Sequence, residues 1–301
     1  MTRPHYLKEG DQIGFVSAAN KISINVIKSA VNTMQSWGLE PVFGQHIFAQ
    51  DNQFAGSDKQ RSADIQDFMD NPQIKAIIST RGGYGSVRII DKLNFEKFKR
   101  FPKWIIGYSD ITVFLSHLNS QLKMECLHST MPLDFPVNGS SNNATESLRK
   151  ALFGELKSYV FKPTKVIRQN QAHGELIGGN LSILYSLIGS ISEMDFDNKI
   201  LFIEDVGEYL YHIDRMMINL KRMGKLKNLA ALVVGGMTNM KDNKTPFGKT
   251  TEEIIAEHVE EYKYPVVFGF PAGHIKENYA LRMGANINLL VDKEESKLVF
   301  D

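Results

Sequence analysis

The chain has 301 residues, of which 43% are hydrophobic and 23% are charged, and its formal net charge at pH 7 is +1. This composition is typical of a globular protein with one or two domains, and it excludes a disordered, fibrous or membrane-embedded chain. No long block of like charge occurs, so nothing in the sequence indicates a nucleic-acid partner.

The amino-terminal segment MTRPHYLKEGDQIGFVSAAN carries charges at Lys8, Glu9 and Asp11. It holds no apolar stretch long enough for a signal peptide or a membrane span. The single cysteine, Cys126, excludes an internal disulfide and is typical of a reducing compartment. We therefore expect a cytoplasmic protein with no membrane partner.

In the first half of the chain, short β-rich apolar runs alternate with segments of helical periodicity. The expected strands are QIGFVSAA at 12–19, LEPVFG at 39–44, IKAIIST at 74–80 and KWIIG at 103–107. The expected helices run from Ile24 to Met34 with a C-cap near Gly38, from the N-cap Ser57 to Met69, and over residues 111–118. This alternation predicts a doubly wound parallel sheet, flavodoxin-like or class I glutamine amidotransferase-like.

The sequence changes character at residues 154–172, which are polar, contain Pro163 and lack helical periodicity. We expect an amino-terminal domain at 1–155, a linker at 156–172 and a carboxy-terminal α/β domain with a mixed sheet at 173–301. The expected strands of the second domain lie at 173–179, 199–205, 229–236 and 264–270, with two more in 285–300, and its helices lie at 181–188, 208–223 and 250–262.

Ser109 stands where an apolar strand ends at Gly107 and a helix begins near Asp110. In open α/β sheets this carboxyl edge is where ligands bind, and a helix amino terminus beside the hydroxyl favours an anion. The corner is similar to the nucleophile elbow of serine hydrolases, but Ile111 occupies the position of the second glycine of G-x-S-x-G. The alternative is that Ser109 or Asp110 only caps a helix.

A nucleophilic serine needs a base, and a base needs an orienting carboxylate. Of the eight histidines, His274 stands in a loop bounded by glycine and proline after a strand, GFPAGHIKEN. Glu204 and Asp205 close the apolar strand KILFIED. The alternatives are a structural or surface histidine and a pair of solvated loop acids, the latter favoured for Asp205.

A third candidate is STRGGYGSVR, which follows a strand and lacks the spacing of a P-loop or a dinucleotide fingerprint. Its glycines permit close approach of backbone N–H groups to a ligand oxygen, as an oxyanion hole requires. Arg81 could hold a carboxylate, or it could be an ordinary surface arginine. No H-E-x-x-H pattern or cysteine cluster occurs, so we expect no metal and no cofactor, and Cys126 is interpreted as a buried, inert thiol.

Together, five stretches resemble the LD-carboxypeptidases, or muramoyltetrapeptide carboxypeptidases, a family of serine peptidases. They occur in the order typical of that family and span nearly the whole chain. The stretches are RGGYG at 81–85, IGYSDIT at 106–112, GGNLS at 178–182, FIEDVGE at 202–208 and GHIKENYALRMG at 273–284.

The resemblance implies a Ser-His-Glu triad, with Ser109 as nucleophile, His274 as general base and then acid, and Glu204 as the carboxylate that orients the imidazole. It places the serine in the first domain and the other two residues in the second. It also implies an oxyanion hole made by the backbone N–H groups of Gly83 and Asp110. Arg81 is then a contact for the substrate's terminal carboxylate.

The family resemblance further implies a homodimer without metal that releases terminal D-alanine from murein tetrapeptide in cell-wall recycling. Related alternatives are a self-immunity peptidase that cleaves a peptide-nucleotide antibiotic, and a non-catalytic peptide-binding protein on the same scaffold. The chain departs from the family at Arg282, where a proline is usual. That change adds a charge near the expected site and frees the backbone, so it bears on substrate preference.

Overall fold

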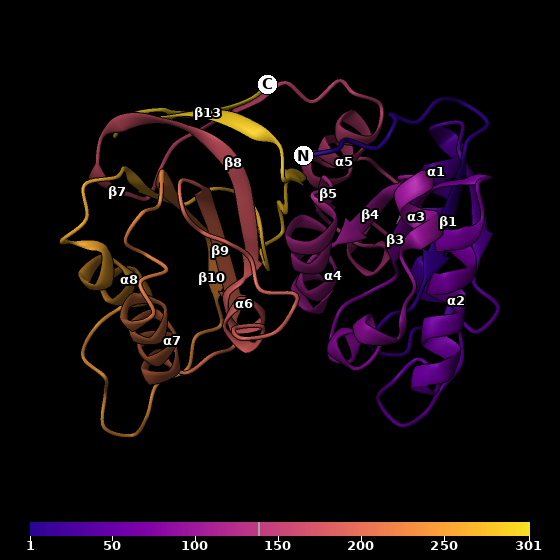
Figure 1. The fold of residues 1–301 in the computed structure, drawn as a ribbon, viewed down its shortest axis with the longest axis horizontal. Helices are drawn as coiled ribbons and strands as arrows, with labels where there is room; N and C mark the ends of the chain where they lie inside the picture. Colours follow the sequence, from indigo (N-terminus) through magenta and orange to yellow (C-terminus); the bar gives the residue numbers. More distant parts are fainter. Residues whose placement is uncertain (138) are drawn as a thin grey trace.

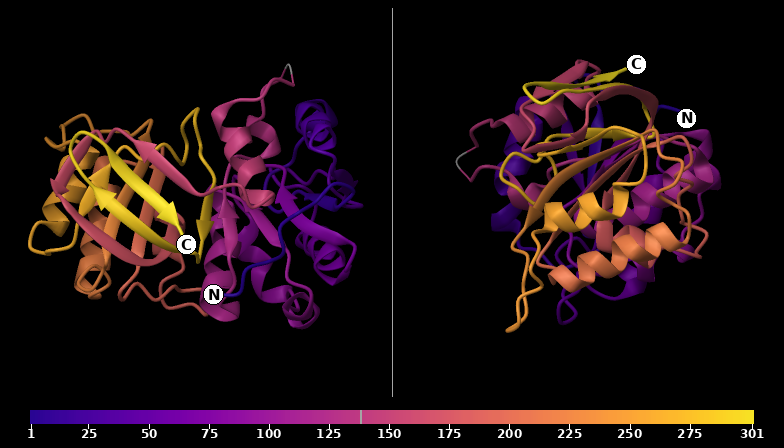
Figure 2. Two further views of the ribbon diagram at one scale, coloured as in Figure 1. Left: turned by 90° about the horizontal axis from the view of Figure 1, so that it is seen from above. Right: turned by 90° about the vertical axis from the view of Figure 1, so that its left-hand side faces the viewer.

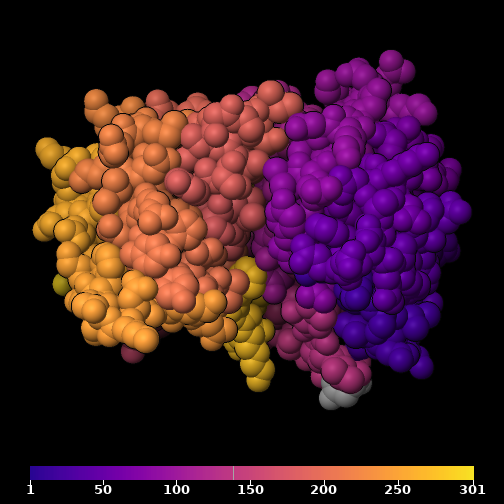
Figure 3. Space-filling view, turned by 90° about the horizontal axis from the view of Figure 1, so that it is seen from below, coloured from indigo at the N-terminus to yellow at the C-terminus, as the bar shows by residue number. Residues whose placement is uncertain are grey.

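The computed structural model describes residues 1–137 and 139–301 and consists of two α/β halves that lie side by side (Figure 1). The space-filling view shows them in contact along a broad boundary (Figure 3). The larger buried cluster of apolar side chains includes residues of both halves, such as Leu127 and Phe202. The two halves therefore share a core, which fixes side chains from one half relative to the other.

The amino-terminal half is built on a sheet whose central strands are all parallel, as predicted. Its strands are β1 (Gln12–Val16), β2 (Glu40–Phe43), β3 (Ile74–Ser79), β4 (Trp104–Gly107), β5 (Cys126–His128) and β12 (Leu281–Met283). In space they follow the order β12-β5-β4-β3-β1-β2. The edge strand β12 comes from the far end of the chain and runs antiparallel to β5, so this sheet is mixed rather than purely parallel.

Three helices of this half, α1, α2 and α4, lie close to their predicted positions, and two more, α3 and α5, were not predicted. They are α1 (Ile24–Ser36), α2 (Asp58–Asp70), α3 (Glu96–Arg100), α4 (Thr112–His117) and α5 (Asn143–Leu152). Ser57 caps α2 through a capping box with Gln60, which confirms the predicted start of that helix. The predicted apolar face of α1 is buried at Ile27, Ala30 and Met34.

The carboxy-terminal half is built on the predicted mixed sheet, in the order β6-β14-β13-β8-β9-β10-β11-β7. The strands are β6 (Ser158–Phe161), β7 (Lys165–Arg168), β8 (Asn170–Asn180), β9 (Ile200–Val206), β10 (Ala231–Thr238), β11 (Val266–Phe268), β13 (Asn286–Val291) and β14 (Ser296–Phe300). The helices are α6 (Leu181–Ser186), α7 (Leu210–Arg222) and α8 (Thr251–Val259). The last two lie side by side and pack their apolar faces against β9, β10 and β11 (Figure 2).

The segment 156–172, expected to be a linker, contains β6, β7 and the start of β8. Residues of β6 are alternately exposed and buried, and this strand pairs with β14, so its apolar residues have a sheet face to cover. The short strands around Pro163 lack the length that makes periodicity visible in a sequence. The division into two domains at this segment stays a proposal.

Arg282 is not a free charge at the site, in contrast to the expectation from the sequence. It lies on β12, is 3% exposed, and donates from Nε and Nη2 to Glu125 Oε2 at 3.1 and 3.0 Å. Its guanidinium also lies over the Phe300 ring, 5.3 Å from the centroid. The charge that replaces the proline is therefore buried and paired, and it ties β12 to the residue that precedes β5.

Arg282→Met should lower the free energy of unfolding by about 3–5 kcal/mol, because Glu125 would remain buried without its partner. Denaturant unfolding of the purified variant measures this loss. In the double variant Arg282→Met/Glu125→Leu no charge is stranded, so much of the stability should return. A double variant less stable than the single one would contradict the assignment of the loss to the stranded carboxylate.

Candidate active site

Ser109 occupies the apex of a tight turn at the carboxyl end of β4. A 3-10 turn over Ser109–Ile111 leads directly into α4. Ser109 has a φ of +62°, a left-handed conformation that is strained for a residue with a side chain and is common at functional sites. No side-chain cap is made at the start of this turn or of α4, so the structure does not support the helix-cap interpretation.

The structure brings Ser109, His274 and Glu204 into one chain of hydrogen bonds. His274 Nε2 lies 3.1 Å from Ser109 Oγ, and His274 Nδ1 lies 2.7 Å from Glu204 Oε2. Glu204 is fully buried on β9, and its Oε2 also accepts the backbone N–H of His274 at 3.1 Å. A proton on Nδ1, facing the carboxylate, leaves Nε2 free to accept the hydroxyl proton.

The loop after β11 fixes His274 from both sides. The hydroxyl of Thr238 donates to the His274 carbonyl oxygen at 2.9 Å, and the backbone N–H of Gly273 donates to Asn278 Oδ1 at 2.8 Å. Gly273 has a φ of +104°, and a Cβ there would lie 2.6 Å from the Cβ of Glu204. Glycine is therefore required for the loop to approach the carboxylate so closely.

The environment of His274 makes it a stronger base than an isolated imidazole. Burial alone would lower its pKa, but the hydrogen bond to Glu204 and the negative charges of Glu204, Asp205 and Asp134 outweigh burial, so the pKa of His274 is raised. Protonated imidazole cannot accept a proton from Ser109. A reaction that uses this base should therefore fall off as the pH drops through the raised pKa.

The glycine loop at 81–85 packs directly against Ser109. A Cβ on Gly82 would lie 2.9 Å from Ser109 Cβ and 3.0 Å from Ser109 Oγ. Gly83, with a φ of +119°, leaves no room for a Cβ beside the Asn20 side chain. The backbone N–H of Ser86 donates to Asp110 Oδ2 at 2.8 Å, which ties the end of the loop to the residue after Ser109. The predicted donors Gly83 and Asp110 thus belong to segments held on either side of the serine, and their oxyanion role stays a prediction.

Gly82→Ala should reduce the rate of Ser109 acylation by about 10²-fold, because the added methyl group would displace the hydroxyl or the loop. Gly82 has no positive φ, so the substitution introduces crowding at Ser109 without backbone strain. The rate of labelling by a fluorophosphonate measures the effect, and thermal unfolding checks that the fold is kept. Labelling at the unchanged rate would show that the loop does not crowd the serine.

Both halves of the chain match models of known protein domains. Residues 13–129 match the LD-carboxypeptidase N-terminal domain, and residues 173–289 match the LD-carboxypeptidase C-terminal domain. The chain belongs to the LD-carboxypeptidase family. Ser109 lies in the first matched range, and Glu204 and His274 lie in the second.

Individual relatives of this family member match nearly its whole length. A probable murein peptide carboxypeptidase of Bacillus subtilis is 30% identical over 94% of this chain and 90% of that protein. The crystal structure of a muramoyltetrapeptide carboxypeptidase from Oxalobacter formigenes superposes with a TM-score of 0.86 at 26% identity, over 96% of this chain and 98% of that one. The microcin C7 self-immunity protein MccF, at 23% identity, shares the fold with a TM-score of 0.87 over 98% of both chains.

Arg81 lies at the start of the glycine loop and is partly buried. Its Nη1 donates to the Lys21 carbonyl oxygen at 3.3 Å, and its Nε is buried without a hydrogen-bond partner among the described residues. Among the residues that the structure describes, no carboxylate forms an ion pair with Arg81. Its predicted contact with a substrate carboxylate stays a prediction.

Asp205 is not the solvated loop acid that the sequence favoured. It is 1% exposed, and it accepts from Asn180 Nδ2 at 3.0 Å and from the backbone N–H of Ser182 at 2.9 Å. Burial, together with the charge of Glu204, raises the pKa of Asp205 to about 6. The GGNLS stretch thus serves to hold the acid next to Glu204, a role that sequence reasoning missed.

Two aromatic rings beside the candidate site, Tyr108 and His128, were also not predicted from the sequence as part of the site. Tyr108 packs against the His274 ring with centroids 4.8 Å apart, and His128 lies edge-on to Tyr108 at 5.8 Å. His128 is fully buried, and burial lowers its pKa to about 4, so this second imidazole is neutral at pH 7. The sequence signal for a buried His128 was its position two residues after Cys126 on an apolar strand.

Three further observations concern possible metal ligands, the single cysteine and membrane-spanning helices. Within 1–137 and 139–301, no three His, Cys, Asp or Glu side chains are grouped as metal ligands would be. Cys126 is buried and its pKa is raised by burial, so the thiol is inert, in agreement with the sequence interpretation. Among the same residues, no helix has the length and apolar character needed to cross a bilayer.

Proposed function

We propose that this member of the LD-carboxypeptidase family is a serine peptidase that works by acyl transfer to water, with Ser109 as nucleophile, His274 as base and Glu204 as the orienting carboxylate. The observation that carries the proposal is the hydrogen-bonded chain from Ser109 through His274 to the buried Glu204. The left-handed φ of Ser109 supports it, because a strained corner is what a nucleophile elbow requires.

In the proposed reaction, His274 Nε2 takes the Ser109 proton as Oγ attacks an amide carbonyl carbon. The negative charge that develops on the carbonyl oxygen is stabilised by the backbone N–H groups of Gly83 and Asp110. The imidazolium then gives its proton to the leaving amine, and the C–N bond breaks. A water molecule, deprotonated by His274, attacks the acyl-enzyme, and Ser109 recovers its proton.

We propose murein tetrapeptide as substrate, cleaved between the L-centre of meso-diaminopimelate and the terminal D-alanine. The names of the Bacillus and Oxalobacter relatives support this choice. Arg81, at the edge of the glycine loop, would bind the carboxylate of the leaving D-alanine. The cytoplasm as location and a homodimer as assembly belong to the same proposal.

A competition assay tests the proposal. Murein tetrapeptide and an aminoacyl-sulfamoyl adenylate are offered together, and the products are identified by mass spectrometry. Release of D-alanine is the expected result, and cleavage of the adenylate alone would assign the chain to the self-immunity type. A chain that cleaves neither compound and does not react with a fluorophosphonate would be a binding protein on this scaffold.

A further inference from the structure

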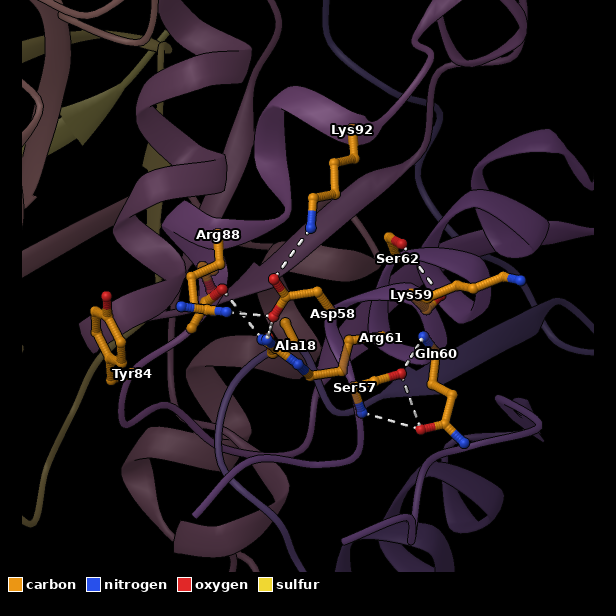
Figure 4. Close-up of polar contacts among 12 residues, drawn as sticks. Ala18, Ser57, Asp58, Lys59, Gln60, Arg61, Ser62, Tyr84, Arg88 and Lys92 are labelled. Atoms are coloured by element: carbon orange, nitrogen blue, oxygen red, sulfur yellow. Dashed lines mark hydrogen bonds and ion pairs between the residues drawn. The ribbon is translucent and has the colours of Figure 1, made fainter. Parts of the chain in front are cut away.

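Arg61 is a buried cation that no step of the proposed reaction uses. It is the fourth residue of α2, and only 2% of it is exposed. Its Nη1 donates to the carbonyl oxygen of Ala18 at 2.6 Å (Figure 4). The same nitrogen donates to the carbonyl oxygen of Gly85 at 3.1 Å. Ala18 follows β1, and Gly85 closes the glycine loop beside Ser109. One guanidinium therefore connects two loops at the carboxyl edge of the first sheet.

The glycine loop is shaped around this guanidinium. A Cβ on Gly85 would lie 2.4 Å from Arg61 Nη1, and the φ of Gly85 is +143°. The third glycine of RGGYG is thus required by the approach of Arg61, whereas Gly82 is required by the approach of Ser109. Substrate contact is not needed to explain Gly85.

The other side of the Arg61 guanidinium is anchored by Asp58. Nη2 pairs with Asp58, which also accepts from Arg88 Nε at 2.9 Å and from Lys92 Nζ at 3.0 Å (Figure 4). The hydrogen bond from Arg88 is the main cause that lowers the pKa of Asp58 to about 2, so the carboxylate stays charged at neutral pH. Arg61 is therefore held in one orientation by a charged partner.

The loop has two further attachments near Ser109. The backbone N–H of Ser86 donates to Asp110 Oδ2 at 2.8 Å, and Asn20 Oδ1 accepts the backbone N–H of Tyr84 at 3.3 Å. Arg61 thus holds Gly85, while Asp110 and Asn20 hold the residues on either side of it. These attachments hold the three residues that directly follow Gly83, whose N–H is proposed to face the reacting oxygen.

We propose that Arg61 is a positioning residue for the oxyanion hole: its guanidinium fixes the Gly85 carbonyl so that the glycine loop keeps the Gly83 N–H aimed at the oxygen above Ser109. The inference rests on the proposed function, because it assumes that Ser109 is acylated. It extends that function to a side chain that touches neither substrate nor triad. Loosening the loop should weaken transition-state stabilisation while leaving ground-state binding largely intact.

The chain offers a matched control at the other end of the same helix. Lys103 is 1% exposed, and its ammonium donates to three backbone carbonyl oxygens at the end of α2. These belong to Phe68 at 2.9 Å, Met69 at 3.0 Å and Asn71 at 2.6 Å. Arg61→Met and Lys103→Met both remove a buried cation from backbone carbonyls, but only the first removes it from the glycine loop.

The test compares Arg61→Lys, Arg61→Met and Lys103→Met with the unmodified protein. We expect Arg61→Met to lower kcat for the tetrapeptide by about 10²-fold with KM changed by less than about threefold. Fluorophosphonate labelling should slow by a similar factor, and amide hydrogen exchange at 82–86 should become faster. Arg61→Lys keeps the charge but loses the planar guanidinium, so its kcat and labelling rate should lie between those of the unmodified protein and Arg61→Met. Lys103→Met should label at the unmodified rate at any temperature where it is folded.

Three results would overturn the inference. If labelling slowed equally in Arg61→Met and Lys103→Met, the slowing would come from a general loss of stability and not from the glycine loop. A rise in KM with kcat unchanged would place Arg61 in substrate binding. Unchanged exchange at 82–86 would show that Arg61 does not fix the loop. If Arg61→Met does not fold, Arg61→Lys gives the same comparisons.

Labelling needs Ser109, its base His274 and the oxyanion hole but no tetrapeptide, so it separates this inference from the choice of substrate. An unmodified protein that is labelled but does not cleave tetrapeptide would contradict the proposed substrate and leave the Arg61 test in force. An unmodified protein that is not labelled would contradict the nucleophile and the Arg61 inference together.

Discussion

Replacing Ser109 with alanine is expected to lower kcat for tetrapeptide hydrolysis by about 10⁶-fold, the largest effect of any single substitution considered. The hydroxyl is placed to attack, since Oγ lies 3.1 Å from the ring nitrogen of His274 that does not face Glu204. What activity remains would come from the oxyanion hole and binding acting on water. Tetrapeptide binding should survive, which isothermal titration calorimetry on Ser109→Ala would measure.

Ser129 provides the control for that experiment. It is a fully buried serine just after β5, and its backbone N–H donates to the carbonyl oxygen of Gly107. Its hydroxyl has no hydrogen-bond partner among the described residues. Ser129→Ala should therefore keep near-normal turnover and fluorophosphonate labelling, whereas Ser109→Ala should lose both. Near-normal tetrapeptide cleavage by Ser109→Ala would show that the nucleophile is wrongly assigned.

The sequence predicted the parts of the fold that depend on local pattern. Alternating apolar runs and helical periodicity placed the parallel strands other than β5 and most of the helices, and Ser57 marked the start of α2. The pattern could not predict β12, because three residues have no periodicity and pair with β5 only through the tertiary fold. It also missed β6 and β7, which are four residues each and flank Pro163.

For the candidate site, the sequence predicted the three triad residues but not the side chains that hold them in place. Ser109 follows β4 of the first sheet, Glu204 lies near the end of β9 of the second sheet, and His274 lies in the loop after β11. Ligands bind at the carboxyl ends of such strands, so each residue was a candidate by itself, but the meeting of the two sheets was not visible in the sequence. The side chains that hold them were not predictable, since Arg61 and Asp205 have the appearance of ordinary surface charges in a sequence. Their roles follow from their burial, because a buried polar group needs hydrogen-bond partners. Burial in turn is determined by the tertiary fold.

Glu204→Gln is expected to lower kcat by about 10⁴-fold while the fold and the position of the imidazole are kept. In the native site Glu204 Oε2 accepts both from Nδ1 and from the backbone N–H of His274. A glutamine can present its oxygen there, but without the charge that stabilises the imidazolium. If it presents its amide nitrogen instead, the ring proton moves to Nε2, which can then no longer accept the proton of Ser109.

The pH dependence of Glu204→Gln gives a test that loss of rate alone cannot give. In the native protein kcat/KM should fall on the acid side as His274 protonates, at a pH above the ordinary imidazole value, because its pKa is raised. Burial by itself would lower that pKa, and Glu204 is the main cause that opposes burial. Removing the charge should therefore move the acid limb of the residual activity to lower pH.

Asp205→Asn is the matched variant for this shift. It removes a carboxylate one residue further along β9, where the side chain binds Asn180 and Ser182 and makes no hydrogen bond to the imidazole. Its acid limb should move in the same direction but by less, because Asp205 affects His274 through charge alone. An acid limb that stayed in place in Glu204→Gln would mean that the titrating group is not His274. The base would then have to be sought elsewhere, even if the rate had fallen as expected.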